Sequence, residues 1–239
     1  MSHINTRNWI GAVLLAAALV GSAAREAAAS SITIGNPASG EINTFPFGGA
    51  YAALLATRYQ QVYSGSLFGG SFSIDAVSFY AADAPGLSGT NANGTYTLSL
   101  STTSAGVNGL SSNLASNVGT DTEAFFSGAL PPYPPAAGDL LTFTLATPFT
   151  FDPANGNLLL DVQFSGVTNG SNAFYVAQNG DFGSASSRMV NGGRAGTSFG
   201  LVTTFDGQSE PTVPEPTTML LVGTGLIASI KRTGRSRTR

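Results

Sequence analysis

The segment Thr95-Tyr-Thr-Leu-Ser-Leu-Ser-Thr-Thr103 alternates between larger apolar side chains and small hydroxyl side chains. Tyr96, Leu98 and Leu100 share one face of an extended chain, and the Ser and Thr residues between them share the other. This period of two predicts a β-strand over 95–103. We expect its apolar face to be buried and its hydroxyl face to be in contact with water.

Similar apolar runs lie on both sides of this segment, separated by turns rich in Gly, Pro, Asn and Asp. They lie at residues 32–34, 72–80, 141–145, 149–151, 158–164 and 199–205. About eight to eleven short strands without a convincing long helix are typical of two packed β-sheets. The sequence therefore predicts an all-β fold, an antiparallel β-sandwich with a jelly-roll-like topology.

Two irregular segments refine this expectation. The apolar residues of 72–80 change parity, which predicts a β-bulge near Asp75 and Ala76. Between residues 104 and 120, three apolar residues lie four apart, which favours a short helix or a loop draped over the sheet. These are Leu110, Leu114 and Val118.

The N-terminal segment has the three parts of a secretory signal. Arg7 supplies positive charge, residues 9–20 are largely apolar, and small residues follow. Ala27-Ala28-Ala29 fits the small-x-small cleavage rule, and Ser22-Ala23-Ala24 offers an earlier site. We therefore expect a signal peptide over 1–29, helical in its apolar part.

A folded domain is expected over residues 30–212, and this region is acidic. It has eleven Asp and Glu residues against three Arg, a net charge of minus eight, while the whole chain carries minus three. It also has no Cys, Lys or His, since the single His is His3. These absences exclude disulfides, Ser-His-Asp triads, His-ligated metals, and thiolate or Schiff-base nucleophiles from residues 30–212. The charge does not favour binding to nucleic acid.

The C-terminal 27 residues, 213–239, form a third segment with three parts. A proline-fixed tetrapeptide comes first: Val213, Pro214, Glu215 and Pro216. The apolar run 217–230 follows; as a helix of about 14 residues it is roughly 21 Å long, short of the about 30 Å hydrocarbon core of a bilayer. The basic tail comes last: Lys231, Arg232, Arg235, Arg237 and Arg239. Such a helix spans a membrane only marginally, with the cations on the cytoplasmic side and the domain outside.

This three-part segment resembles the PEP-CTERM sorting signal of Gram-negative bacteria, and the resemblance covers about the last tenth of the chain. It implies export through the secretion translocon and transient anchoring in the inner membrane. It also implies processing by exosortase, a membrane protease-transpeptidase, and delivery to the cell surface in association with extracellular polysaccharide and biofilm. An ordinary tail anchor after a linker is the alternative. Neither interpretation assigns a molecular activity.

Oxygen-bearing side chains suggest two further sites. A calcium ion requires several oxygen ligands, and candidates gather at one turn: Asp152, Asn155, Asn157 and Asp161. Asn179 and Asp181 mark a second turn, although β-turns favour the same residue types without a metal. Asp121 and Glu123 would share one face of an extended chain and supply the two acids of a glycoside hydrolase. A solvated loop before a strand is the alternative for this pair.

Aromatic side chains suggest a sugar-binding platform, although a fold of this size also needs most of them for its core. The candidates are Tyr51, Tyr59, Tyr63, Tyr133 and Tyr175. Arg58 is a candidate for orienting an anion, or a structural residue. We expect a non-enzymatic, structural or adhesive surface protein with no catalytic residue and no cofactor other than calcium. A carbohydrate-binding module is the second hypothesis, and a secreted carboxylate-based glycan hydrolase the third.

Overall fold

The computed structural model describes residues 28–48, 57–82, 89–134, 136–168, 173–178, 185–190, 194–196 and 199–210. All of them belong to one unit, Ala28–Glu210. The expected apolar signal helix, the sorting tetrapeptide, the C-terminal apolar helix and the basic tail lie outside the described residues. Within the described residues, the helices are too short or too polar to span a bilayer.

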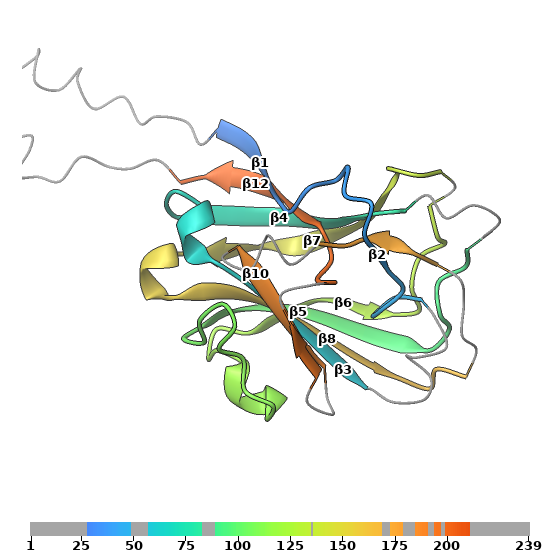
Figure 1. Cartoon of the computed structure of the whole chain (residues 1–239). Coiled ribbons are helices and arrows are strands. Elements are labelled where there is room, and N and C mark those ends of the chain that lie inside the picture. Colours follow the sequence, from blue (N-terminus) through green and yellow to red (C-terminus); the bar gives the residue numbers. More distant parts are fainter. Residues whose placement is uncertain are drawn as a thin grey trace, which may run out of the picture. The chain divides into compact units, whose positions relative to one another are not determined.

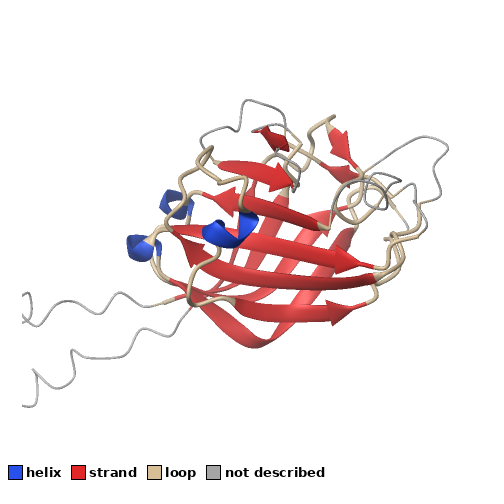
Figure 2. Ribbon diagram, turned by 90° about the horizontal axis from the view of Figure 1, so that it is seen from below, coloured by secondary structure: helices blue, strands red, loops and turns tan. Residues whose placement is uncertain are grey.

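Strands dominate the described structure, and the few helices are single turns in the loops (Figure 2). The strands are β1 (Ala28–Ile34), β2 (Ile42–Asn43), β3 (Arg58–Tyr63), β4 (Phe72–Tyr80), β5 (Thr95–Thr103), β6 (Glu123–Gly128), β7 (Leu140–Phe151), β8 (Asn157–Ser165), β9 (Tyr175–Val176), β10 (Ser186–Val190), β11 (Arg194–Gly196) and β12 (Thr203–Ser209). The 3₁₀ helices are η1 (Gly65–Leu67), η2 (Leu114–Asn117) and η3 (Pro153–Asn155). The prediction of an all-β fold is confirmed, and β5 has the predicted bounds.

The strands form two main antiparallel sheets (Figure 1). One has the order β1-β12-β4-β7, the other β11-β10-β3-β8-β5-β6, and β2 pairs with β9 in a separate ribbon. Apart from β2, β9, β10 and β11, the chain changes sheet at every step except between β5 and β6. The resulting sheets, β1-β12-β4-β7 and β3-β8-β5-β6, have the strand order of an eight-stranded jelly roll.

The core lies between the two sheets. Aromatic rings from opposite sheets meet there, with centroids 5.0 Å apart for Tyr63 and Phe205 and 4.9 Å apart for Phe126 and Phe143. Both pairs meet edge to face, the favourable geometry for aromatic rings. The apolar face of β5 is wholly buried in this core, as its alternation predicts.

The predicted bulge in β4 is confirmed. The pairing of β4 with β7 slips between Ile74 and Ala76, so Asp75 interrupts the alternation. As a result Ile74 and Val77, which have opposite parity in the sequence, are both fully buried. The bulge thus places the apolar residues before and after Asp75 on the same face of the sheet, although their alternation shifts by one residue.

The expectation of a water-exposed face on β5 holds only at the start of the strand, where Thr95 is exposed and Thr97 is half-buried, and is wrong for the rest. Ser99 is 8% exposed and Ser101 is 1% exposed. The segment after β5 covers them, because Leu110 and the η2 residue Leu114 pack onto the outside of the sheet. They form a second apolar cluster with three strand residues: Val62, Leu159 and Met189. The segment is therefore both a single-turn helix and a draped loop.

Candidate functional site

Arg58 forms a structural ion pair. Its Nε and Nη2 atoms donate to Oδ1 and Oδ2 of Asp161, both at 2.7 Å. The Asp161 side chain is 4% exposed and that of Arg58 is 21% exposed. Gln60 and Gln163 also donate to the Asp161 carboxylate. The alternative in which Arg58 is structural therefore holds, and Asp161, although on the outer face of β8, is buried.

Asp152 and Asn155 organise a turn. The backbone N–H of Ala154 donates to Asp152 Oδ1 at 3.0 Å, and Asn155 Nδ2 donates to Asp152 Oδ2 at 3.3 Å. Asp152 thus caps η3, which begins at Pro153. The structural interpretation of these residues accounts for both side chains.

The side chains of the other two calcium candidates have partners away from this turn. Asn157 accepts from the backbone N–H of Gly65 at 2.9 Å and donates to the carbonyl of Ala105 at 2.9 Å. Asp161 lies four residues further along β8, about 13 Å away at the rise of a strand. Asp161 therefore lies apart from the turn residues with which the sequence analysis grouped it. Among the described residues, no three His, Cys, Asp or Glu side chains are grouped to hold a metal; Asn179 and Asp181 lie outside them.

The expected carboxylate pair has two different surroundings. Asp121 lies in a turn, where its Oδ1 accepts from the backbone N–H of Thr102 at 2.8 Å. Glu123 is the first residue of β6 and lines a pocket. The two acids do not lie on one strand, because β6 begins after Asp121, and Asp121 lies in the loop before it, as the alternative interpretation had it.

The described tyrosine candidates do not form a surface platform. Tyr59, Tyr63 and Tyr175 are fully buried. Tyr133 is half-buried, and its hydroxyl donates to the carbonyl of Phe174 at 2.7 Å. Burial raises the pKa of Tyr59 to about 12, while the nearby Arg188 opposes this increase. These side chains belong to the core, and Tyr51 lies outside the described residues.

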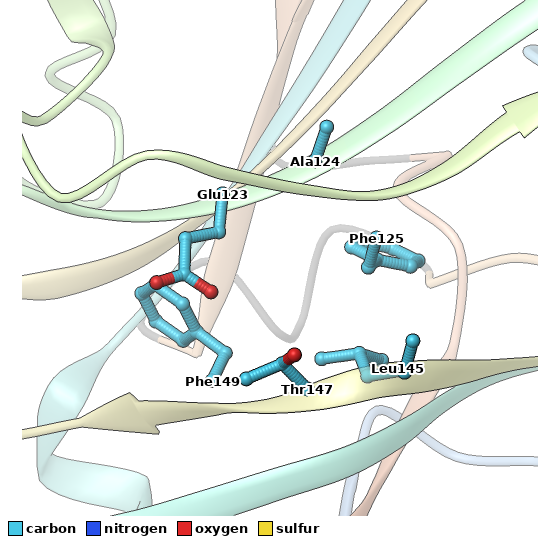
Figure 3. Close-up of a pocket in the computed structure, with 7 residues that line it drawn as sticks. Glu123, Ala124, Phe125, Leu145, Thr147 and Phe149 are labelled. Carbon is cyan, nitrogen blue, oxygen red and sulfur yellow. The ribbon is translucent and has the colours of Figure 1, made fainter.

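A pocket of about 280 Å³ lies between β6 and β7 (Figure 3). These are edge strands of the two opposite sheets. Its lining comes from both strands: Glu123, Ala124, Phe125, Leu145, Ala146, Thr147 and Phe149. We call it the β6/β7 pocket.

Two bulges on facing strands shape the β6/β7 pocket. Phe125 has no partner in β5, although the residues on either side of it pair with consecutive residues there. Residues 145–148 of β7 lie opposite Asp75 alone in β4. Pro148 also lacks the N–H needed for regular pairing. Bulges redirect side chains and occur often at sheet edges and beside functional sites.

The pocket combines polar and apolar groups. Glu123 and Thr147 are exposed, and Figure 3 shows the Glu123 carboxylate extending from β6 toward Phe149 of β7. Phe125 is half-buried and packs against Phe143, with ring centroids 6.4 Å apart. Phe149 is 3% exposed. This arrangement suits a small ligand with hydroxyl groups and an apolar face. The sequence interpretation singled out Glu123 but missed the pocket, for which Pro148 was the available signal.

Comparison with protein families places a known segment after the described unit. Residues 212–237 match the family model of the PEP-CTERM protein-sorting motif. The chain carries a PEP-CTERM sorting motif. The match includes Val213, Pro214, Glu215 and Pro216, the apolar run, and the basic residues up to Arg237. It confirms the resemblance seen in the sequence.

Other comparisons add little to the PEP-CTERM motif. No curated protein matches the chain. Among solved structures, the chain is similar to the VP2 subviral particle of infectious bursal disease virus, with 11% identity and a TM-score of 0.24. This similarity covers 88% of the chain and 50% of the viral chain, so the chain spans half the length of that protein.

Proposed function

We propose that this protein is exported through the secretion translocon and held briefly in the inner membrane by its C-terminal segment. An exosortase-type membrane protease then recognises the PEP-CTERM motif and processes it. The β-sandwich reaches the cell surface or extracellular matrix, where it acts without enzymatic activity as a structural or adhesive component of exopolysaccharide and biofilm.

The observation that carries this proposal is the position of the motif. Glu210 is the last described residue, and its backbone N–H donates to the carbonyl of Ser71 at 3.0 Å. The match to the sorting motif begins at residue 212. In the sequence only Pro211 separates the two, so any processing at the motif determines where the jelly-roll domain is delivered.

The chemistry of the domain supports a non-enzymatic role. Residues 30–212 lack His, Cys and Lys, the side chains on which most nucleophilic and general-base sites depend. Three of the acids considered for catalysis or metal binding have structural partners. The Asp121 carboxylate accepts from the backbone of Thr102, that of Asp152 accepts from the backbone of Ala154, and that of Asp161 pairs with Arg58. No specific observation favours the glycan hydrolase.

The test of sorting is replacement of Pro214, Glu215 and Pro216 together by alanine in the full chain. We expect this variant to remain in the inner membrane with its basic tail intact. Pro211→Ala is the matched control, because it removes a proline just outside the matched residues. Release of the triple variant to the surface at the rate of the control would refute the proposal.

A carbohydrate-binding module is the second candidate, and the β6/β7 pocket favours it. Glu123 and Thr147 supply hydrogen-bonding groups beside the half-buried ring of Phe125. A glycan array probed with the full chain distinguishes a ligand-binding protein from a purely structural one. Absence of glycan binding would leave the structural role as the proposal.

A further inference from the structure

We propose that the β6/β7 pocket binds one neutral hexopyranose unit of a polysaccharide. This proposal rests on the adhesive role proposed above and identifies the chemistry by which adhesion would occur. Glu123 and Thr147 hold hydroxyl groups of the sugar, and Phe125 packs against its apolar face.

The volume of the pocket sets the size of the ligand. Pockets for drug-sized ligands enclose about 300–1,000 Å³, and this one encloses about 280 Å³. It therefore admits a ligand of one ring, and further units of a polysaccharide would lie outside it. The pocket lies between two edge strands, so in the described part of the chain no third strand pairs on that side of the sandwich.

The polar groups match a polyol. An ionised carboxylate only accepts hydrogen bonds, and its two oxygens can receive two neighbouring hydroxyl groups at once. Glu123 reaches the pocket from β6, and the Thr147 hydroxyl reaches it from β7 (Figure 3). Thr147 can donate as well as accept, so it complements a sugar oxygen that Glu123 cannot satisfy.

The apolar groups favour a sugar over an organic ammonium ion. An aromatic cage for ammonium needs exposed ring faces within about 6 Å of the cation. Only Phe125 is partly exposed here, since Phe149 is 3% exposed and forms the floor. One accessible ring suits the flat C–H face of a pyranose. Its contact with Phe143 holds the Phe125 ring in place before a ligand arrives.

Charge selects neutral sugars over acidic ones. The residue at the pocket that contacts the hydroxyl groups is itself an acid, and residues 30–212 carry a net charge of minus eight. A uronate or sulfated sugar would bring a second negative charge beside Glu123, which like-charge repulsion opposes. Neutral hexoses carry no such penalty.

The test uses the purified full chain in detergent, titrated with neutral gluco-, galacto- and manno-oligosaccharides and, separately, with oligouronates. We expect a neutral oligosaccharide to bind with a Kd between about 1 μM and 1 mM, a range ordinary for a small ligand held by few contacts. Glu123→Gln should weaken this binding about tenfold to a hundredfold, because it removes a charge-assisted acceptor. Thr147→Val should weaken it about threefold to tenfold.

Controls separate binding from folding. Glu41→Gln changes an exposed acid away from the pocket and should leave the affinity unchanged. Glu123 is exposed, so Glu123→Gln should not alter the melting temperature. No neutral oligosaccharide binding, equal binding by Glu123→Gln, or preference for oligouronates would each overturn the proposal, as would competition for the same pocket by a simple alkylammonium ion.

Failure of this proposal is distinguishable from failure of the sorting proposal. Glu123→Gln should be processed and delivered as the unaltered chain is. The variant with alanine at 214–216 should remain in the membrane yet still bind the oligosaccharide after purification. Loss of binding in both variants would overturn the assignment of the sugar site to the β6/β7 pocket.

Discussion

Replacement of Arg58 by methionine isolates the energetics of the buried ion pair. The substitution keeps an unbranched side chain but removes both charged donors at 2.7 Å from Asp161. Asp161, whose side chain is 4% exposed in the unaltered protein, then keeps the two amide donors of Gln60 and Gln163. Removing one partner of a buried pair costs about 3–5 kcal/mol, and the remaining amide bonds place this case at about 3 kcal/mol.

Replacement of Asp161 should lower the free energy of unfolding by less than replacement of Arg58 does. Asp161→Asn removes the carboxylate that faces Arg58, but the arginine is 21% exposed and can turn toward water. We expect a loss of about 1–2 kcal/mol. The double variant Arg58→Met with Asp161→Asn should be more stable than Arg58→Met alone, because it leaves no buried charge. The burial of Asp161 thus predicts a larger loss for Arg58→Met than for Asp161→Asn. For an exposed ion pair, either substitution would change the free energy of unfolding by only about 0–1 kcal/mol.

Equilibrium urea unfolding of the three variants measures these differences. For a domain of this size a loss of about 3 kcal/mol lowers the melting temperature by roughly 6–12 °C. The coupling free energy from the double-mutant cycle should reach about 2 kcal/mol. A loss under about 1 kcal/mol for Arg58→Met, with no coupling to Asp161, would show that the pair is not buried in solution.

Three further predictions concern the loop that packs over the sheet, a buried tyrosine of the core, and the turn at Asp152. Leu114→Ala should lower the free energy of unfolding by about 2 kcal/mol, measured in urea, because Leu114 is 5% exposed beneath its loop; an unchanged value would mean that the loop does not cover β5. The pKa of Tyr59 is raised from 10.0 to about 12, so the unfolded state loses this proton first. Stability should be retained below pH 10 and fall by about 1.4 kcal/mol per pH unit for this group between pH 10 and 12; a flat profile of urea unfolding over that range would contradict the burial of Tyr59. The melting temperature should be the same with calcium and with a chelator, because the side chains of Asp152 and Asn155 form a hydrogen bond with each other. A higher melting temperature with calcium would instead support a calcium site at this turn.

Local alternation was sufficient to predict individual strands and the bulge. The period of two gave the bounds of β5, and the change of parity around Asp75 located the bulge in β4. Both features depend on neighbours along the chain. The sequence could not show that the loop carrying Leu114 returns over the outer face of the sheet, since its contacts with Val62 and Leu159 join residues of different segments. The hydroxyl face of β5 was therefore predicted to be exposed to water.

The candidate site depends even more on contacts between distant segments. Glu123 and Thr147 are far apart in the sequence, and they meet only because β6 and β7 lie at the same edge of two opposed sheets. The bulge at Phe125 is also invisible in a sequence with two consecutive phenylalanines, either of which could face the core. The partner of Asp161 could not be assigned for the same reason. The sorting motif, by contrast, is contiguous, and the sequence alone identified it.

The intact mass of the protein recovered from the cell surface or the medium tests the central claim most directly. Cleavage of both ends gives a chain that begins at Ser30, or at Arg25 if the earlier signal site is used, and that lacks the basic tail 231–239. We expect such a species, and no soluble full-length protein in the cytosol. Recovery of the chain from Met1 to Arg239 as a soluble cytosolic protein would contradict both export and sorting.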